Sequence, residues 1–362
     1  MRKAALVAVM AVVVLACGSM QAQKIQFSVH NDAPVHGVWI MRPWIGIHDG
    51  GFQTFTIGQP ASSAVQHIAE DGVTGDAANV LPPPNTCGGL AGVYGPAAPC
   101  MFDVFNSYAN HGPQATIGNP TPPEGGGVAI FTNSTVSTTF QLNHNDARQQ
   151  FLSYLVMIIP SNDAFWGTDS ASAIRLFKNG RFNNGKGAIT LHISGSDILD
   201  AGTETNDEGT IVPGDTAFLN QAVNGTGSHP DAGDPNVHQH PGFIAGGPIL
   251  TGTNPFGATF GNADFAHNGL PVATVTISVV PGSVDPAIAL LSTLDWRTAQ
   301  SLNAKLQNAK KALDGGNFDS GCGMLGAVTN EVNAQSGKSL TSAQANALLG
   351  ALGDAANWNG CQ

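Results

Sequence analysis

Acidic side chains gather in two segments whose spacing could bind a divalent cation. Asp163 follows the apolar run 151–159, and the segment 200–208 begins with Asp200 and carries Glu204. Calcium takes about six to eight oxygen ligands from carboxylates, amides and backbone carbonyls. Loops at one end of a β-sandwich can supply such a set, so a calcium site is one interpretation. A capped turn at Asp163 and a solvated loop over 200–208 explain the same residues without a metal, and the spacing alone favours this simpler interpretation.

A second group of potential metal ligands lies between residues 229 and 240. It contains His229, His238 and His240, together with Asp231 and Asp234. On an extended segment His238 and His240 would point to the same side, which suits zinc or copper if a third ligand comes from elsewhere. The alternative function is therefore a metal-dependent hydrolase or oxidase. A polar loop stiffened by prolines, with exposed histidines, is the simpler interpretation.

Sequence motifs for nucleophilic catalysis and phosphate binding give only one isolated match. The chain has no G-x-S-x-G elbow, no H-E-x-x-H and no Walker loop. Gly321, Gly323 and Gly326 match G-x-G-x-x-G, but they lie in a helical pattern without the preceding strand that a dinucleotide site needs. We therefore expect that the protein is not an enzyme.

The elements that must position these residues are mostly strands up to residue 282. Short runs rich in Val, Ile, Phe and Thr alternate with loops rich in Gly and Pro, and a single helix is predicted over 62–71. This texture is typical of a mostly β fold, an antiparallel β-sandwich with long loops. The predicted strands cover residues 127–131, 151–159, 188–193 and 271–279.

Beyond Pro286 the apolar residues recur at helical spacing. Leu302 and Leu306 lie on one face of a first helix, a second helix extends to Gly337, and Thr341-x-x-Gln344 is a capping box that opens a third. The pattern predicts a small three-helix C-terminal module.

The chain is thus expected to hold a leader over 1–22, a sandwich domain over 24–282 and an α-helical module over 286–362. Because Pro281-Gly282 breaks the last strand, we expect few contacts across the junction and two separable folding units.

The leader has the pattern of an export signal. Arg2 and Lys3 precede thirteen apolar or small residues, too few to span a bilayer as a helix. Cleavage after Ala22 would release a free chain. Alternatively, Val14-Leu15-Ala16-Cys17 resembles a bacterial lipoprotein box, in which Cys17 would carry a lipid anchor.

The charge balance excludes some partners. The chain has 14 Lys and Arg against 25 Asp and Glu, a net charge of −11. Nucleic acids and anionic lipid surfaces need clustered basic residues, which this sequence lacks. No other run reaches the ~18 apolar residues of a membrane helix. We expect a secreted, periplasmic or cell-surface protein without a transmembrane span in its mature chain.

The cysteines predict two local disulfides. Without Cys17 an even number remains, which in an oxidising compartment favours pairing. The nearest pairs are Cys87 with Cys100 and Cys322 with Cys361, and each pair lies within one predicted domain.

Five short motifs, taken in order, resemble the spondin amino-terminal domain family, and specifically its bacterial branch. The resemblance covers roughly residues 24–282. The sequence departs from the animal branch at Asn162 and Ala164, where that branch has Pro and Trp, and in a long insert over 210–268. The motifs are His48-Asp49-Gly50-Gly51-Phe52, Phe55-x-x-Gly58, the segments 61–72 and 155–165, and Leu199-Asp200-Ala201-Gly202-Thr203-Glu204.

The resemblance implies an antiparallel β-sandwich that binds a metal at one end through acidic side chains and acts in extracellular adhesion. Carried over to this chain, the motifs make Asp163 and Asp200 the ligands, with Asp146 as a third. The implied cofactor is calcium, and the implied partner is an extracellular protein or glycan whose identity the sequence does not give.

The C-terminal part has a shorter likeness. Residues 302–313 and 330–338 resemble the three-helix module called FIMAH that ends some secreted bacterial proteins. This resemblance implies an architecture and no particular activity.

Overall fold

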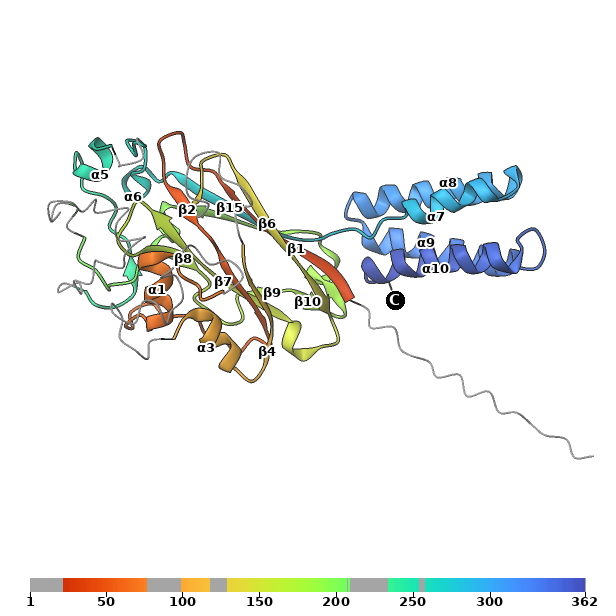
Figure 1. Ribbon diagram of the computed structural model, residues 1–362, viewed down its shortest axis with the longest axis horizontal. Coiled ribbons are helices and arrows are strands. Elements are labelled where there is room, and N and C mark those ends of the chain that lie inside the picture. Colours follow the sequence, from red (N-terminus) through yellow and green to blue (C-terminus); the bar gives the residue numbers. More distant parts are fainter. Residues whose placement is uncertain are drawn as a thin grey trace, which may run out of the picture.

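The computed structural model describes residues 22–76, 99–117, 129–206, 208, 234–253 and 258–361. These residues form a β-rich part and a helical part that follow one another along the longest axis of the molecule (Figure 1). The predicted fold class is confirmed, because antiparallel sheets precede a helical module. Of the predicted leader only Ala22 is described, and it begins the first strand; Cys17 lies outside the described residues.

One layer of the sandwich is a four-stranded sheet in the order β12-β15-β1-β6. Its strands are antiparallel, and buried residues alternate with half-exposed ones along β1, as a sheet with one solvated face requires. The strands are β1 (Ala22–Asn31), β6 (Thr135–Asn143), β12 (Ile189–Ser194) and β15 (Pro271–Val279).

The second layer is built around β7 (Phe151–Ile159), in which eight of nine residues are buried. Its main path runs β14-β13-β8-β7-β2-β5, and β3 joins β7 to β4. The strands are β2 (Trp39–Met41), β3 (Trp44–His48), β4 (His111–Thr116), β5 (Ala129–Ile130), β8 (Ala164–Gly167), β9 (Ile174–Arg175), β13 (Leu199–Asp200) and β14 (His238–Gln239); β10 (Phe177–Lys178) and β11 (Arg181–Phe182) form a separate hairpin.

The main core lies between the two sheets. Phe27 of β1 and Tyr154 of β7 meet there, with ring centroids 5.6 Å apart. A second apolar cluster lies on the other face of β7, where Val65 and Ile68 of α1 (Ser63–Asp71) pack with Leu155. Because β7 is covered on both faces, its sequence is a continuous apolar run.

The helix predicted over 62–71 is confirmed as α1. The Ser62 side chain caps its first turn, and Gly72 ends it in the left-handed region with φ of 63°. The sequence did not predict the other short helices of this part. They are α3 (Met101–Ser107), α5 (Pro248–Thr251), α6 (Phe265–Asn268) and the 3-10 turns η2 (Ala147–Gln149), η3 (Asn183–Gly185) and η4 (Gly195–Asp197).

The helical part contains the three predicted helices and one short additional helix. Thr341 and Gln344 form the predicted capping box, and the Cys322–Cys361 disulfide is confirmed. Cys87 lies outside the described residues, so its bond to Cys100 stays a prediction. None of the described helices is long and apolar enough to cross a membrane. The elements are α7 (Asp285–Leu290), η5 (Leu291–Thr293), α8 (Trp296–Asp314), α9 (Phe318–Gln335) and α10 (Ser342–Trp358).

Candidate functional site

Strand pairing brings the two main acidic candidates together. Asp163 lies in the turn that joins β7 to β8, and Asp200 is the last residue of β13. In the β13–β8 ladder Asp200 stands opposite Ala164, the neighbour of Asp163. The Ser161 hydroxyl holds this turn, because it donates to the Ile158 carbonyl at 2.8 Å and accepts the Ala164 N–H at 3.0 Å.

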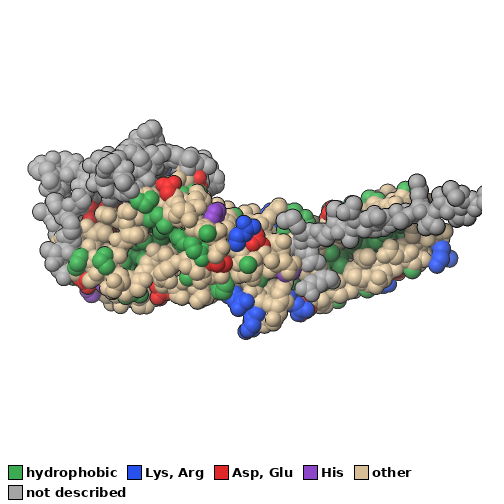
Figure 2. Space-filling view, turned by 90° about the horizontal axis from the view of Figure 1, so that it is seen from below, with side chains coloured by type: hydrophobic (Ala, Val, Ile, Leu, Met, Phe, Trp, Pro, Cys, Tyr) green, Lys and Arg blue, Asp and Glu red, His purple; other side chains and the backbone are tan. Residues whose placement is uncertain are grey.

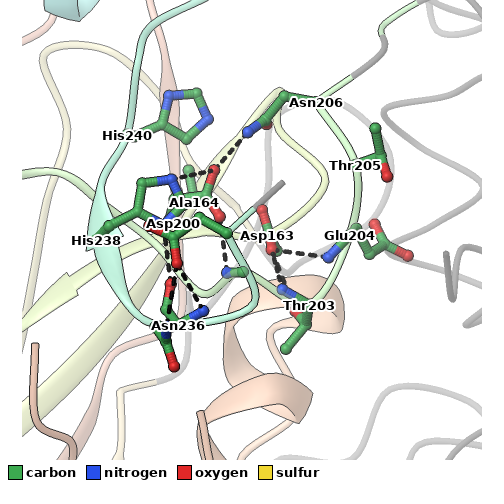
Figure 3. A network of polar contacts seen from close by, with 12 residues as sticks. Asp163, Ala164, Asp200, Thr203, Glu204, Thr205, Asn206, Asn236, His238 and His240 are labelled. Atoms are coloured by element: carbon green, nitrogen blue, oxygen red, sulfur yellow. Dashed lines mark hydrogen bonds and ion pairs between the residues drawn. The ribbon is translucent and has the colours of Figure 1, made fainter. Parts of the chain in front are cut away.

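The Asp163 carboxylate is fully buried, and among the described residues only one of its two oxygens is hydrogen-bonded. Its Oδ2 accepts the backbone N–H groups of Thr203 and Glu204 at 2.9 and 3.1 Å and the Thr203 hydroxyl at 3.1 Å (Figure 3). Its Oδ1 is buried and has no hydrogen-bond partner among the described residues. Burial, and next the negative charge of Asp200, hold the pKa of Asp163 well above its usual range.

Asp200 is also fully buried and is held by its own loop. Its Oδ1 accepts the Gly202 N–H at 2.7 Å, and its Oδ2 accepts the Asn206 side-chain amide at 2.5 Å. Gly202 has φ of 68°, and a Cβ there would lie 2.6 Å from the Asn236 carbonyl oxygen. Only glycine fits this position, where the loop turns beneath the segment that leads into β14.

A third carboxylate, which the sequence analysis did not assign, lies in the last turn of α1. Glu70 is buried, accepts the Gln66 amide at 2.7 Å, and contributes to the raised pKa of Asp163 through its charge. One local feature of the sequence could have indicated a role for Glu70. It is a charged residue two positions before Gly72, which ends the helix, and the helix has few exposed positions. Its proximity to Asp163 depends on the packing of α1 against the second sheet.

The electrostatics of this cluster fit a divalent cation. The charged groups that act on Asp163 are two further carboxylates, Asp200 and Glu70. A cation beside the Asp163 Oδ1 would give that oxygen a partner and relieve the repulsion. The described residues contain no preformed group of three or more His, Cys, Asp or Glu side chains around a metal position. Backbone carbonyls and water would have to complete the coordination.

The other two acidic candidates are placed differently. Glu204 contributes its backbone N–H to Asp163, while its buried carboxylate points away from the Asp163 carboxylate (Figure 3). Asp146 precedes β7, whereas Asp163 follows it, so the length of a nine-residue strand, ~30 Å, separates them. The Asp146 carboxylate caps η2 and pairs with Arg148 at 2.8 Å, which lowers the pKa of Asp146. The structure does not bring Asp146 to the Asp163–Asp200 pair.

Two histidines flank Asp200 from β14 and the residues after it (Figure 3). The Nε2 of His238 lies 4.0 Å from Asp200 Oδ2, and its Nδ1 donates to the Asn236 carbonyl at 2.8 Å. The Nδ1 of His240 accepts the Gly242 N–H at 2.9 Å, so its buried Nε2 carries the ring proton; among the described residues that nitrogen has no hydrogen-bond partner. Burial lowers the pKa of His240 to about 4. His229 and Asp231 lie outside the described residues.

The motif around His48 lies at the opposite end of β7 from the Asp163–Asp200 pair. His48 stands opposite Phe151 at the start of β7, and Asp163 follows the end of that strand. The His48 Nδ1 accepts the Gly50 N–H at 3.0 Å, and its Nε2 therefore donates to the Ser153 hydroxyl at 2.9 Å. Burial lowers the pKa of His48 to about 4, so its ring is neutral at pH 7.

Comparison with known proteins gives no assignment. No family model matches the chain, and no curated protein matches it.

Proposed function

We propose that the protein is an exported, non-catalytic β-sandwich that binds calcium at the Asp163–Asp200 pair and contacts an extracellular partner with that end. The observation that carries the proposal is the buried Asp163 Oδ1, which has no hydrogen-bond partner among the described residues. The negative charges of Asp200 and Glu70 act on the same carboxyl group. Asp163 and Asp200 would hold the cation, with Glu70 beside them. When bound, calcium supplies positive charge that orders the loop over 200–206.

Two features support the same end of the sandwich as a contact surface. On the face shown in Figure 2, the visible Lys and Arg side chains lie toward the middle of the molecule and on the helical part, away from the end with α1 and α5. Ile57 and Ile244 are about half exposed, at 51% and 50%. The segment of Ile57 is tied to the site, because Gly58 N–H donates to the Val237 carbonyl at 2.7 Å. Ile57, held by a loop that is tied to the site, is the apolar side chain that we assign to the contact.

Calcium titration of the full chain tests the metal site. Isothermal calorimetry on metal-stripped protein should show one site, and Asp163→Asn should abolish the heat of binding. Asp146→Asn is the matched control, because it removes a carboxylate that lies at the other end of β7. Absence of calcium binding by the unaltered chain would overturn the proposed site.

Contact with a partner is tested separately. The full chain would be applied to immobilised glycans and matrix proteins with calcium or with chelator. We expect calcium-dependent retention that is lost in Ile57→Ser, while calcium binding by this variant is unchanged. Retention that ignores both calcium and Ile57 would place the contact elsewhere.

A transition-metal enzyme is the second candidate, and one observation favours it. The rings of His238 and His240 both flank Asp200, which could serve as the third ligand that such a site needs. His240 would bind a metal only after its Nδ1 gives up the Gly242 N–H, because that bond leaves the proton on Nε2. Elemental analysis of protein purified without chelator separates the two proposals. Zinc or copper at one equivalent, lost in His240→Gln, would support a hydrolase or oxidase, whereas calcium supports the binding protein.

A further inference from the structure

The residues that follow α10 connect the helical part to the sandwich. We call Asn359-Gly360-Cys361 the C-terminal turn. The Asn359 side chain clamps the backbone of Gly282, with Oδ1 accepting its N–H and Nδ2 donating to its carbonyl, each at 3.1 Å. The Asn359 carbonyl in turn accepts the side-chain amide of Gln23 in β1 at 3.0 Å. Asn359 is only 1% exposed, so these bonds are shielded from water.

The backbone at this contact leaves no room for larger residues. Gly360 has φ of 66°, and a Cβ there would lie 1.9 Å from the Gln23 amide nitrogen. A Cβ on Gly282 would lie 2.4 Å from the Cβ of Trp358. The C-terminal turn therefore fits the sandwich only while its backbone keeps this conformation.

Apolar packing across the junction is provided by Phe318 of α9, which lies against both the sandwich core and the core of the helical part. A cavity of about 320 Å³ lies between the two parts and is lined by Gln23, Phe182, Phe318, Asn359 and both disulfide cysteines. The buried apolar core of the helical part is made of residues beyond 283 and is separate from the two cores of the sandwich. The attachment of the helical part therefore rests on Phe318 and a few polar contacts.

The disulfide joins the two places where these polar contacts occur. Cys361 belongs to the C-terminal turn, and Cys322 lies in the first turns of α9. Asp319, one turn earlier in α9, pairs with Arg181 of β11 at 2.7 Å. The disulfide to α9 restrains the C-terminal turn and keeps Asn359 and Gly360 in place.

We propose that the Cys322–Cys361 disulfide is a redox-sensitive bond that keeps the helical part attached to the sandwich. We call it the lock. When the bond is intact, the C-terminal turn holds the helical part on the sandwich. A dithiol reductant opens the lock: its two thiols supply two electrons and two protons, the S–S bond becomes two cysteine thiols, and the reagent closes into its own disulfide. The helical part then keeps its fold, because the buried residues of its core include neither cysteine and only Cys361 packs against them from outside, but it loses its fixed position.

Limited proteolysis of the full chain with thermolysin tests the lock. The double variant Cys322→Ser/Cys361→Ser changes only this bond, whereas a dithiol reaches every disulfide. We expect cleavage between residues 280 and 286 to accelerate about tenfold or more, since proteolysis follows the population of the opened segment. Asn359→Ala, with the disulfide intact, should have a similar effect. Asn303→Ala, on the exposed face of α8, should have none.

Three results would overturn the lock. Cleavage of the double variant at the rate of the unaltered chain would mean that the disulfide does not hold the junction. Loss of the far-ultraviolet helical signal in the double variant would make the bond a staple of the helical bundle instead. Equal cleavage of Asn359→Ala and the unaltered chain would show that the C-terminal turn does not carry the attachment.

Discussion

Replacing Asp163 by asparagine separates the effect of a buried carboxylate from that of a bound cation. An amide at this position can keep its oxygen on Thr203 and Glu204, and its NH₂ group takes the place of the oxygen that has no partner among the described residues. The fold should therefore be retained. A cation, however, would lose a charged ligand.

The expected magnitude follows from linkage. At calcium ~100-fold above its Kd, a ligand that binds only the folded state stabilises it by about 2.7 kcal/mol. For a folding unit of this size that raises Tm by roughly 5–10 °C. Differential scanning calorimetry with calcium and with chelator should show this shift in the unaltered chain and in Asp146→Asn, but not in Asp163→Asn.

Without calcium the order of stability should reverse. An acid whose pKa is raised in the folded state favours folding below its unfolded pKa near 4, and this contribution is lost as the pH rises through the folded-state pKa. At neutral pH the calcium-free Asp163→Asn variant should therefore unfold at a higher temperature than the unaltered chain. A variant that keeps the calcium shift, or that is less stable than the unaltered chain in chelator, would refute the reasoning.

Three further predictions concern pH, cysteines and folding units. Because burial lowers the pKa of His48 to about 4, its contribution is complete above pH 6.5 and falls on acidification. The buried His67 and His240 have pKa values lowered in the same way, so chemical denaturation should show a loss of stability from pH 8 to pH 5 that is smaller by about 2 kcal/mol in His48→Gln. A non-reducing peptide map should show Cys87 linked to Cys100, and free thiols at both positions in protein from an oxidising compartment would contradict the pairing. A chain ending at Gly282 should keep the calcium-dependent rise in Tm, because its cores are separate from that of the helices; aggregation of this chain would show that the two parts form one cooperative unit.

The sequence was sufficient to predict a helix or strand where the residues of that element themselves determine where it begins and ends. Strands β7 and β15 begin and end at the predicted residues, because a continuous apolar run and a strict alternation each have clear limits. Helix α1 is bounded by a serine cap and a left-handed glycine, both of which can be recognised in the sequence. In contrast, β1 was missed although Ile25, Phe27 and Val29 alternate with polar residues, since this segment directly follows the predicted leader.

The candidate site was predictable only in part, because it depends on contacts between distant elements. Asp163 and Asp200 are recognisable as carboxylates next to strand ends, yet their proximity comes from the pairing of β13 with β8. Glu70 becomes part of the cluster only through the packing of α1. The expectation for Asp146 ignored strand direction, since residues that precede and follow one strand must lie at its opposite ends.

The loop over 200–206 and the segment over 234–240 have a consequence for how this fold can vary. Asn206 is fastened to Asp200, and the Asp234 carbonyl lies close above Gly202, so the chain leaves and re-enters the site at neighbouring points. Closing a longer loop between two fixed points costs little, about 0.6 kcal/mol for each doubling of its length. Glu208 is fastened as well, since its carboxylate accepts the Ile244 N–H at 2.6 Å. The positions between 208 and 234 are thus the point at which sequences of different length could be exchanged while the carboxylate pair keeps its geometry.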